Sequence, residues 1–267
     1  MKQVICIHWG TKFGPDYVNR LYGMVARNVT PPFTVTCFCD DPAGMRPEVR
    51  TEPLPPIDYD IPRVGPGKWP KSRLWSPRLG DLDGPVLFLD LDVVVRASLD
   101  PFFAFGRPED VVLSYNQSTP FERLGQTSVF RFPVGALAPM QRLFAEDPEG
   151  IARQYRFEQR FVTRNAPGGI KLFPRDWVAH FRGECRRPFP LNYALAPREP
   201  KKARVVIFPG GTLPEHAIEG RYGPKHPAGG ATEHLSRLFA KDRPEPPFRY
   251  LRHYLRPAPW VARHWRS

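Results

Sequence analysis

Apolar residues recur along the first 40 positions in a pattern that predicts a strand, a helix and a second strand. Residues 4–7 and 33–39 are short apolar runs, typical of buried strands. Between them, Pro15 stands where a first helical turn favours proline, and apolar side chains follow at helical spacing. We therefore expect a βαβ opening and an α/β fold with a mostly parallel, twisted sheet. The helical positions are Tyr17, Val18, Leu21, Tyr22 and Val25.

The pattern is less regular through the rest of the chain. Residues 53–70 are rich in proline and glycine without periodicity, which indicates either a lid-like loop or an excursion around the sheet. Beyond residue 220, prolines, glycines and charges prevail. We expect one domain over residues 1–220 and an extension over residues 221–267 that is packed on the domain or peripheral to it. Further strand-like runs are 111–115, 170–173 and 204–208, and residues 135–146 have the spacing of a helix.

The apolar run at residues 86–95 is interrupted by two aspartates. Its β-branched composition is typical of a strand that is buried on both faces. In an extended chain, side chains two positions apart point the same way, so Asp90 and Asp92 would share one face. Two carboxylates held together at a strand end must be paired, protonated or bound to a cation.

These two carboxylates predict a metal site. Hard oxygen ligands on one side of a cleft suit Mg²⁺ or Mn²⁺, with phosphate oxygens completing the coordination shell. The alternative is a strand that ends in a turn, with one aspartate capping the next helix. A cap needs a single aspartate, whereas this strand carries both Asp90 and Asp92.

The composition is that of a folded globular protein with a buried core. Of the 267 residues, 41% are hydrophobic and 13% are aromatic. We expect no membrane span, since no apolar stretch approaches the roughly 18 residues that one requires, and no signal peptide at the start of the sequence. The cysteines Cys6, Cys37, Cys39 and Cys185 lack metal-finger spacing, so we expect buried, reduced thiols in a cytoplasmic protein.

The net charge of +12 favours anionic partners. The densest basic segments are residues 248–256 and 260–266, where arginines are interleaved with tyrosine and tryptophan. This arrangement suits a peripheral contact with an anionic membrane surface, and it suits a solvated terminal helix equally well. We do not expect nucleic acid as a partner, because no binding motif accompanies the charge.

Two segments ahead of the aspartates are candidates for contacts with a phosphorylated ligand. Ligands of open α/β sheets bind outside the carboxyl ends of the strands, so residues 9–14 form either a nucleotide-binding loop or a plain tight turn. Lys71 and Arg73 belong to a basic, aromatic segment, where they reach a diphosphate at the aspartates or carry solvated helix charge. The amides of Asn116 and Gln117, after the run 111–115, are candidates for the same cleft.

Several motifs occur together in one order. Asp90-Leu91-Asp92 is a DxD motif, and Val93 to Val95 and Leu99 to Phe102 fit its usual continuation. With the motifs below, it makes residues 4–219 similar to the GT-A glycosyltransferases, the nucleotide-diphospho-sugar transferases, and especially to those related to glycosyltransferase family 8. The other matching segments are Trp9-Gly10-Thr11-Lys12-Phe13, Tyr17 to Tyr22, Lys71, Thr127-Ser128-Val129-Phe130 and Glu158-Gln159-Arg160-Phe161.

The resemblance implies an enzyme that transfers a sugar from a nucleotide-diphosphate donor to a hydroxyl acceptor on a glycan or glycolipid, with retention of configuration. Ser128 and Asn116 would then lie on the acceptor side of the cleft. Glu158 and Gln159 would lie near the reacting sugar, although both are also interpretable as helix-surface residues. The implied donor-binding residues are Trp9, Gly10, Thr11, Tyr17, Lys71, Arg73, Asp90 and Asp92.

The chain departs from the family pattern at the third metal ligand. Relatives supply a histidine in a late Phe-His-Gly element, whereas this chain has Pro209 at the matching position. Proline offers no side-chain ligand. We favour His216 as the replacement, with His180 or a water molecule as alternatives.

Two other functions fit some of the same residues. Asp90-Leu91-Asp92-Val93-Val94 also satisfies the signature of haloacid-dehalogenase-type phosphatases, in which the first aspartate is a nucleophile and Mg²⁺ lies alongside. That chemistry requires a later pair of acidic ligands, which the sequence does not show at a strand end. A nucleotide- or carbohydrate-binding module without turnover would keep the fold, but the intact aspartate pair counts against it.

Overall fold

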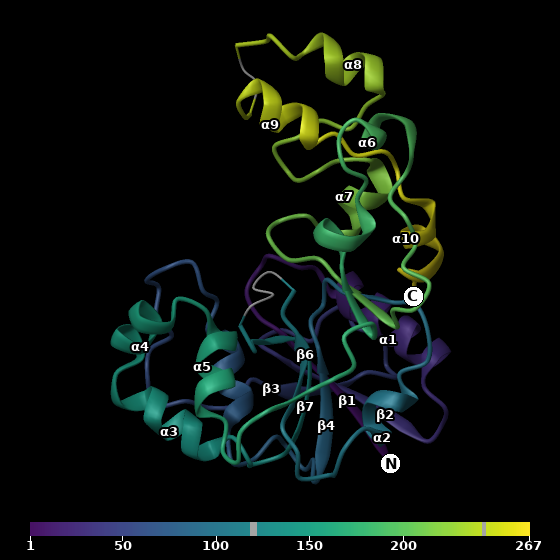
Figure 1. Cartoon of the computed structure of the whole chain (residues 1–267). Coiled ribbons are helices and arrows are strands. Elements are labelled where there is room, and N and C mark those ends of the chain that lie inside the picture. The colour runs from purple at the N-terminus through teal and green to yellow at the C-terminus, as the bar shows by residue number, and fades with distance from the viewer. Residues whose placement is uncertain (118–121, 242–243) are drawn as a thin grey trace.

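The computed structural model describes residues 1–117, 122–241 and 244–267, which form a seven-stranded sheet and a smaller three-stranded sheet (Figure 1). The large sheet has the order β3-β2-β1-β4-β7-β6-β8, so the first strand of the chain lies inside it. The small sheet has the order β5-β10-β9. The strands are β1 (Lys2–His8), β2 (Phe33–Cys39), β3 (Arg50–Pro53), β4 (Pro85–Leu89), β5 (Val94–Val95), β6 (Val112–Tyr115), β7 (Gly125–Pro133), β8 (Lys171–Leu172), β9 (Val178–His180) and β10 (Val205–Ile207).

The strand directions confirm the predicted α/β architecture with a mostly parallel sheet. β1 pairs in parallel with β2 along its whole length, from Lys2 opposite Phe33 to His8 opposite Cys39, and it pairs in parallel with β4 on its other side. Among the described strands of the large sheet, β7 alone runs against its neighbours, β4 and β6. The carboxyl ends of β1 and β4 therefore lie next to each other at one edge of the sheet.

Alternating side chains of the central strands supply two separate cores. In β1, Val4 and Cys6 point into one core while Ile5 and Ile7 point into the other, as the two-residue period of a strand requires. One face packs against α1 and the small sheet, and the other packs against α3, α5 and the short 3₁₀ helix (Figure 1). The first helices are α1 (Pro15–Asn28), α2 (Asp100–Ala104), α3 (Ala138–Glu146), α4 (Pro148–Tyr155) and α5 (Glu158–Asn165), with a 3₁₀ helix at Pro70–Trp75.

The run 86–95 is not the single strand that its apolar pattern predicts. β4 ends at Leu89, the chain turns at Leu91 and Asp92, and β5 then pairs with β10 in the small sheet. The apolar pattern conceals this break because β4 and β5 are both buried. Asp90 and Asp92 thus lie in the connection between two sheets, and it is this turn, not an extended strand, that brings them to one cleft.

The last part of the chain both joins the core and projects from it. Trp260, Val261 and Trp265 are buried in the core that contains α1, and α10 contacts α7 and β5. By contrast, α8 and α9 stand away from the large sheet in Figure 1. None of the helices within the described ranges is long and apolar enough to cross a membrane. The later helices are α6 (Leu191–Ala194), α7 (Pro214–Glu219), α8 (Ala231–Ser236), α9 (Pro247–Arg252) and α10 (Pro259–His264), with a π-helical turn at Phe181–Cys185.

Candidate active site

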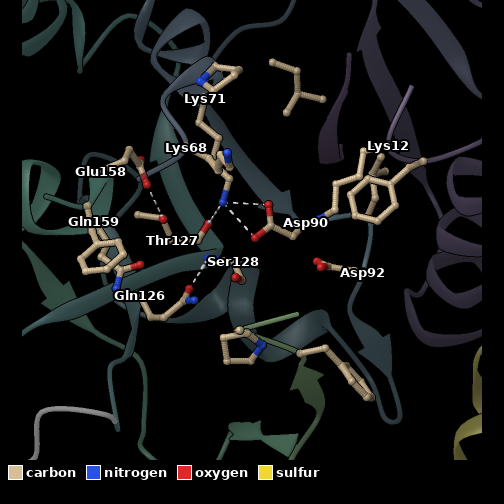
Figure 2. A pocket seen from close by; sticks show the side chains of 18 of the residues that line it. Lys12, Lys68, Lys71, Asp90, Asp92, Gln126, Thr127, Ser128, Glu158 and Gln159 are labelled. Carbon is tan, nitrogen blue, oxygen red and sulfur yellow. Dashed lines mark hydrogen bonds and ion pairs between the residues drawn. The ribbon is translucent and has the colours of Figure 1, made fainter. Parts of the chain in front are cut away.

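A cleft of about 360 Å³ opens at the carboxyl ends of β1 and β4. The connection that carries Asp90 and Asp92 forms its floor, and Lys71 reaches it from the 3₁₀ helix (Figure 2). β7 and the start of α5 close one side, and the loop after β10 faces them. Of the candidates from the sequence, Trp9, Lys71, Asp90, Asp92, Ser128, Glu158 and Gln159 line this cleft.

Asp90 is the best-anchored residue of the cleft. Lys71 Nζ lies 2.7 Å from Asp90 Oδ1 and 2.9 Å from Oδ2, and it also reaches the carbonyl oxygen of Thr127 at 3.4 Å. The backbone N–H of Asp90 donates to the carbonyl of Ser128 at 3.0 Å, which extends the contact between β4 and β7 beyond the strand end. Asp92 lies apart from this ion pair in Figure 2.

The electrostatics of the cleft indicate that its negative charge is incompletely balanced. Burial, together with the neighbouring charge of Asp90, raises the pKa of Asp92 to about 7, although Lys12 and Lys71 act in the opposite direction. Burial lowers the pKa of Lys71, but the charges of Asp90, Glu158 and Asp92 outweigh it and raise that pKa overall. Lys71 is therefore a fixed cation, and Asp92 is a carboxyl group that one more positive charge would ionise.

This donor set fits a divalent cation. Two carboxylates on the floor of a cleft are the hard oxygen ligands that Mg²⁺ and Mn²⁺ prefer. Burial beside Asp90 raises the pKa of Asp92, and a bound cation would favour its ionised form. In the part of the chain that the structure describes, no histidine, cysteine or further carboxylate joins Asp90 and Asp92 in a three-ligand cluster.

The structure does not bring either histidine candidate to the carboxylates. His216 Nδ1 accepts the backbone N–H of Leu213 at 3.2 Å, so this side chain caps its own helix, α7, and it does not line the cleft. His180 Nδ1 faces the N–H of Gly183 at 3.3 Å, and His180 does not line the cleft either. Of the alternatives that the sequence leaves open, water is the one that this geometry accommodates.

The protonation of His180 should make the stability of the folded protein depend on pH. Burial and the adjacent charges of Arg182 and Arg186 lower its pKa to about 4. In the unfolded chain this histidine is protonated below about pH 6.5, whereas in the folded chain it is protonated only below about pH 4. The free energy of unfolding should therefore fall as the pH drops from about 6.5 to about 4. The expected loss from this group is about 2 kcal/mol, allowing for its partial exposure. His180→Asn keeps an acceptor for Gly183 and should flatten that part of the pH profile in urea unfolding; an unchanged slope would contradict the assignment.

Glu158 and Gln159 begin α5 but differ in their surroundings. Glu158 is buried, and its Oε2 accepts a hydrogen bond from Thr127 Oγ1 at 2.6 Å. Burial raises the pKa of Glu158, against the opposing effect of Lys71. Gln159 lines the cleft beside Gln126, whose side-chain oxygen accepts the backbone N–H of Ser128. Glu158 is thus buried and is not the helix-surface residue that one interpretation of the sequence expected. Gln159 offers a neutral amide to the cleft.

The loop after β1 contributes to two adjoining hollows. Trp9 lines the cleft and also a neighbouring hollow of about 800 Å³, which shares Lys68 and Pro70 with the cleft. Gly10 and Arg73 line only this second hollow. The cleft with the carboxylate pair is thus connected to a larger space through the three shared residues, Trp9, Lys68 and Pro70. This space is bordered by the Pro/Gly-rich segment 53–70.

Four other sequence candidates lie outside both hollows. One of them, Gln117, donates a side-chain hydrogen bond to the carbonyl of Val178 at 3.1 Å. Thr11 is exposed. Tyr17 is buried in α1, and its hydroxyl donates to Glu215 in α7; burial and this contact raise its pKa above the ordinary value. Asn116 is buried, and its backbone N–H donates to the carbonyl of Leu124. Tyr17 therefore links two helices beneath the site and is not at the cleft surface.

Lys12 belongs to the predicted loop of residues 9–14 but was not proposed individually as a site residue, and Gly210 was not proposed. Both line the cleft. Lys12 follows β1 and acts on the charge of Asp92, so the rule that sites form at the carboxyl ends of strands was a usable signal. Gly210 and Gly211 have φ values of 80° and 87°. This left-handed backbone strongly favours glycine, and the double glycine after β10 is the signal that marks the loop.

Comparison with known proteins rests on structure alone. No family model and no curated protein matches the sequence. The chain is similar in structure to the galactosyltransferase LgtC in complex with donor and acceptor sugar analogs, with 15% identity, a TM-score of 0.52, and coverage of 88% of this chain and 94% of LgtC. It is also similar to the glycosyltransferase GlyE of Streptococcus pneumoniae TIGR4, with 11% identity, a TM-score of 0.58, and coverage of 80% of this chain and 56% of GlyE.

The chain has the GT-A glycosyltransferase fold. The bifunctional glycosyltransferase WbbM adds a third similar structure, with 12% identity, a TM-score of 0.55, and coverage of 80% of this chain and 46% of WbbM. At these identities the likeness establishes the fold alone.

Proposed function

We propose that the protein is a metal-dependent glycosyltransferase that moves a sugar from a nucleotide-diphosphate donor to a hydroxyl group of a glycan or glycolipid. The observation that carries the proposal is the Asp90–Lys71 ion pair beside Asp92, in a cleft at the carboxyl ends of β1 and β4 of a GT-A fold. Departure of a nucleoside diphosphate places growing negative charge on phosphate oxygens. Fixed positive charge at that position lowers the barrier.

The two adjoining hollows suggest how the donor lies. The larger hollow, with Gly10 and Arg73, has room for the nucleoside, and Trp9, Lys68 and Pro70 border the passage into the cleft. The diphosphate would lie between Lys71 and the carboxylates, and the sugar would extend toward Gln159 and Ser128. Gln159 can orient sugar hydroxyls with its amide, because an amide both donates and accepts hydrogen bonds.

Asp90 and Asp92 would hold Mn²⁺ or Mg²⁺, which when bound neutralises charge on the leaving diphosphate. The ammonium group of Lys71 would also neutralise charge on the leaving diphosphate. Its ion pair with Asp90 fixes its position before the substrate binds. In Figure 2, Lys12 lies on the side of Asp90 away from Lys71, and it adds positive charge near Asp92. Retention of anomeric configuration is our proposal from the family resemblance.

A calorimetric titration tests donor binding directly. Nucleoside diphosphates should bind with Mn²⁺ present and bind much more weakly after chelation, because the carboxylate pair repels a diphosphate without the intervening cation. Binding that is unaffected by chelation would contradict the metal site.

A phosphatase of the haloacid-dehalogenase type fits the cleft less well. Among the described lining residues, Glu158 is the one carboxylate besides Asp90 and Asp92, and Thr127 already occupies one of its oxygens. The later acidic pair which that chemistry needs is therefore not formed by the residues that line the cleft. The GT-A fold also favours sugar transfer over this alternative.

We also propose a peripheral contact with the anionic inner face of a membrane. The aromatic residues that make this contact differ from the tyrosines and tryptophans of segments 248–256 and 260–266, from which the sequence suggested it. Tyr250, Tyr254, Trp260 and Trp265 are buried, so these aromatic rings are not available to lipid. In the projecting part of the chain, Phe239 is 86% exposed and Phe248 is 64% exposed. Exposed aromatic rings among basic residues suit an anionic lipid surface. Basic residues nearby in sequence are Arg237, Lys241, Arg249 and Arg252.

Vesicle sedimentation tests this contact. The protein should sediment with phosphatidylglycerol vesicles at low salt, and Phe239→Ser with Phe248→Ser should release it. Leu143→Ser, which alters an exposed apolar residue on α3, is the matched control and should have no effect. Equal sedimentation of the double variant would contradict the proposal.

A further inference from the structure

Two histidines and a glutamate meet in the projecting part of the chain, far in sequence from the aspartate pair. His226 Nε2 lies 3.3 Å from Glu245 Oε2, and His253 Nδ1 lies 2.5 Å from the same oxygen. The three ligand atoms all lie within 4.8 Å of one another. The side chains of His226, Glu245 and His253 are only 10%, 15% and 12% exposed. Three metal-ligating groups therefore converge on one point that is largely shielded from solvent.

The segment around this cluster has almost no core of its own. Among the described residues of 224–253, the buried side chains are His234 and Tyr250, which stack on each other with ring centroids 3.9 Å apart. The helices α8 and α9 each have six residues, which is too short for helices to be stable by themselves. Leu235, Phe239 and Phe248 are exposed. Packing alone gives this segment little stability, and such segments commonly depend on a cross-link or a metal.

The cluster lies where a cross-link would be most effective. His226 stands near the entrance of the segment, and His253 stands at its exit, directly after α9. Joining them closes the intervening loop. The ring of His253 also stacks on Tyr222, with centroids 3.8 Å apart. The guanidinium groups of Arg182 and Arg186 lie over the same tyrosine ring, 4.5 Å and 4.7 Å from its centroid. A metal at this point would attach the segment to residues that adjoin the main domain.

We propose that His226, Glu245 and His253 bind a structural Zn²⁺ ion that cross-links the two ends of the segment 224–253. Two imidazoles and one carboxylate suit zinc, and they differ in kind from the all-oxygen pair of the cleft. Ligand atoms around a tetrahedral zinc ion are about 3.3 Å apart, so the present spacing needs only small side-chain shifts. Arg249 holds the other carboxylate oxygen, Oε1, at 3.2 Å, which orients Glu245 as supporting contacts do in zinc sites. A water molecule would complete the tetrahedral shell.

The first experiment is a zinc titration that excludes the cleft. The full chain with Asp90→Asn and Asp92→Asn should bind one equivalent of Zn²⁺. Adding His253→Phe keeps an aromatic ring to stack on Tyr222 but removes a ligand, and it should abolish this binding. The matched control is His264→Phe, which breaks a histidine–glutamate pair, His264 with Glu199 at 3.2 Å, that has no third ligand in the described residues. The control should retain one equivalent.

The second experiment measures how far zinc stabilises residues 224–253 against local unfolding. At free zinc ten times the dissociation constant, local opening of residues 224–253 should become about tenfold rarer, and cleavage there by a protease about tenfold slower. The His253→Phe chain should show no zinc effect. If that variant does not fold, Glu245→Gln replaces it in both measurements. Equal zinc binding by all variants, no binding by any, or zinc-independent cleavage in the parent chain would overturn the proposal.

Discussion

Replacing Asp92 by asparagine should abolish metal-dependent binding of a nucleoside diphosphate and lower catalytic efficiency by about 10²–10³-fold, without weakening the fold. An amide cannot replace the lost charge at a cation site. In the folded protein, however, burial and Asp90 already make the Asp92 carboxylate costly, which is why its pKa rises to about 7. Removal of that charge should leave stability unchanged or increase it.

The gain in stability should depend on pH in a defined direction. The unfolded carboxyl group ionises near pH 4, whereas the folded group ionises near pH 7, so the ionised form is disfavoured by folding. Its cost therefore grows between about pH 4 and pH 7, and the advantage of Asp92→Asn should grow over the same window. Thermal unfolding at pH 4.5 and pH 8 measures this difference. The control, Asp83→Asn, alters an exposed aspartate just before the opposite end of β4.

Asp90→Asn should behave differently, because Asp90 carries the ion pair. Its loss leaves Lys71 without the carboxylate at 2.7 Å and should cost about 2 kcal/mol of stability as well as activity. A stable but inactive Asp92 variant beside a less stable, inactive Asp90 variant is the expected pattern. Full donor binding by either variant with Mn²⁺ would contradict the site.

Lys71→Met should cause the second large loss, again about 10²–10³-fold in turnover. The variant keeps most of the length of the side chain but removes the charge that contacts both oxygens of Asp90. Without it, Asp90 and Asp92 repel each other in a buried site, so the variant should be less stable in the absence of metal and should recover stability when Mn²⁺ is added.

Lys68→Met is the matched control for Lys71→Met. Lys68 also lines the cleft, but none of its described contacts is an ion pair with the carboxylates. Its loss should change stability little and should leave the response to Mn²⁺ as in the unaltered protein. If the Lys71 and Lys68 variants respond equally to Mn²⁺, Lys71 has no special role at Asp90.

The regular features of the fold could be predicted from the sequence, because they depend on local pattern. The β1–α1–β2 unit follows from apolar periodicity. The DxD motif indicated the two carboxylates, and the basic, aromatic segment ahead of it indicated Lys71, which lines the same cleft. The break after Leu89 could not be predicted, since β4 and β5 are equally apolar and equally buried. Pairing of β5 with β10 depends on a strand more than 100 positions away.

Side-chain direction was a second limit on prediction. Tyr17 follows the loop of residues 9–14 in sequence, but its position on α1 turns it toward Glu215 and into the core. His216 has the right chemistry for a third ligand, yet it caps α7 because its ring accepts the N–H of Leu213. The His226–Glu245–His253 cluster could not be predicted from the sequence either. Its members are distant in sequence and meet only because the folded chain returns through α9.

The most direct measurement is release of nucleoside diphosphate from a panel of nucleotide sugars, with Mn²⁺ and with chelator, by the unaltered protein and by the variant with Asp90→Asn and Asp92→Asn. Sugar transfer predicts metal-dependent release from at least one donor, increased by a hydroxyl acceptor and abolished in the double variant. Tight nucleotide binding without release would show a binding module. Hydrolysis of simple phosphomonoesters, with a beryllium fluoride adduct at Asp90, would show a phosphatase and contradict the proposed function.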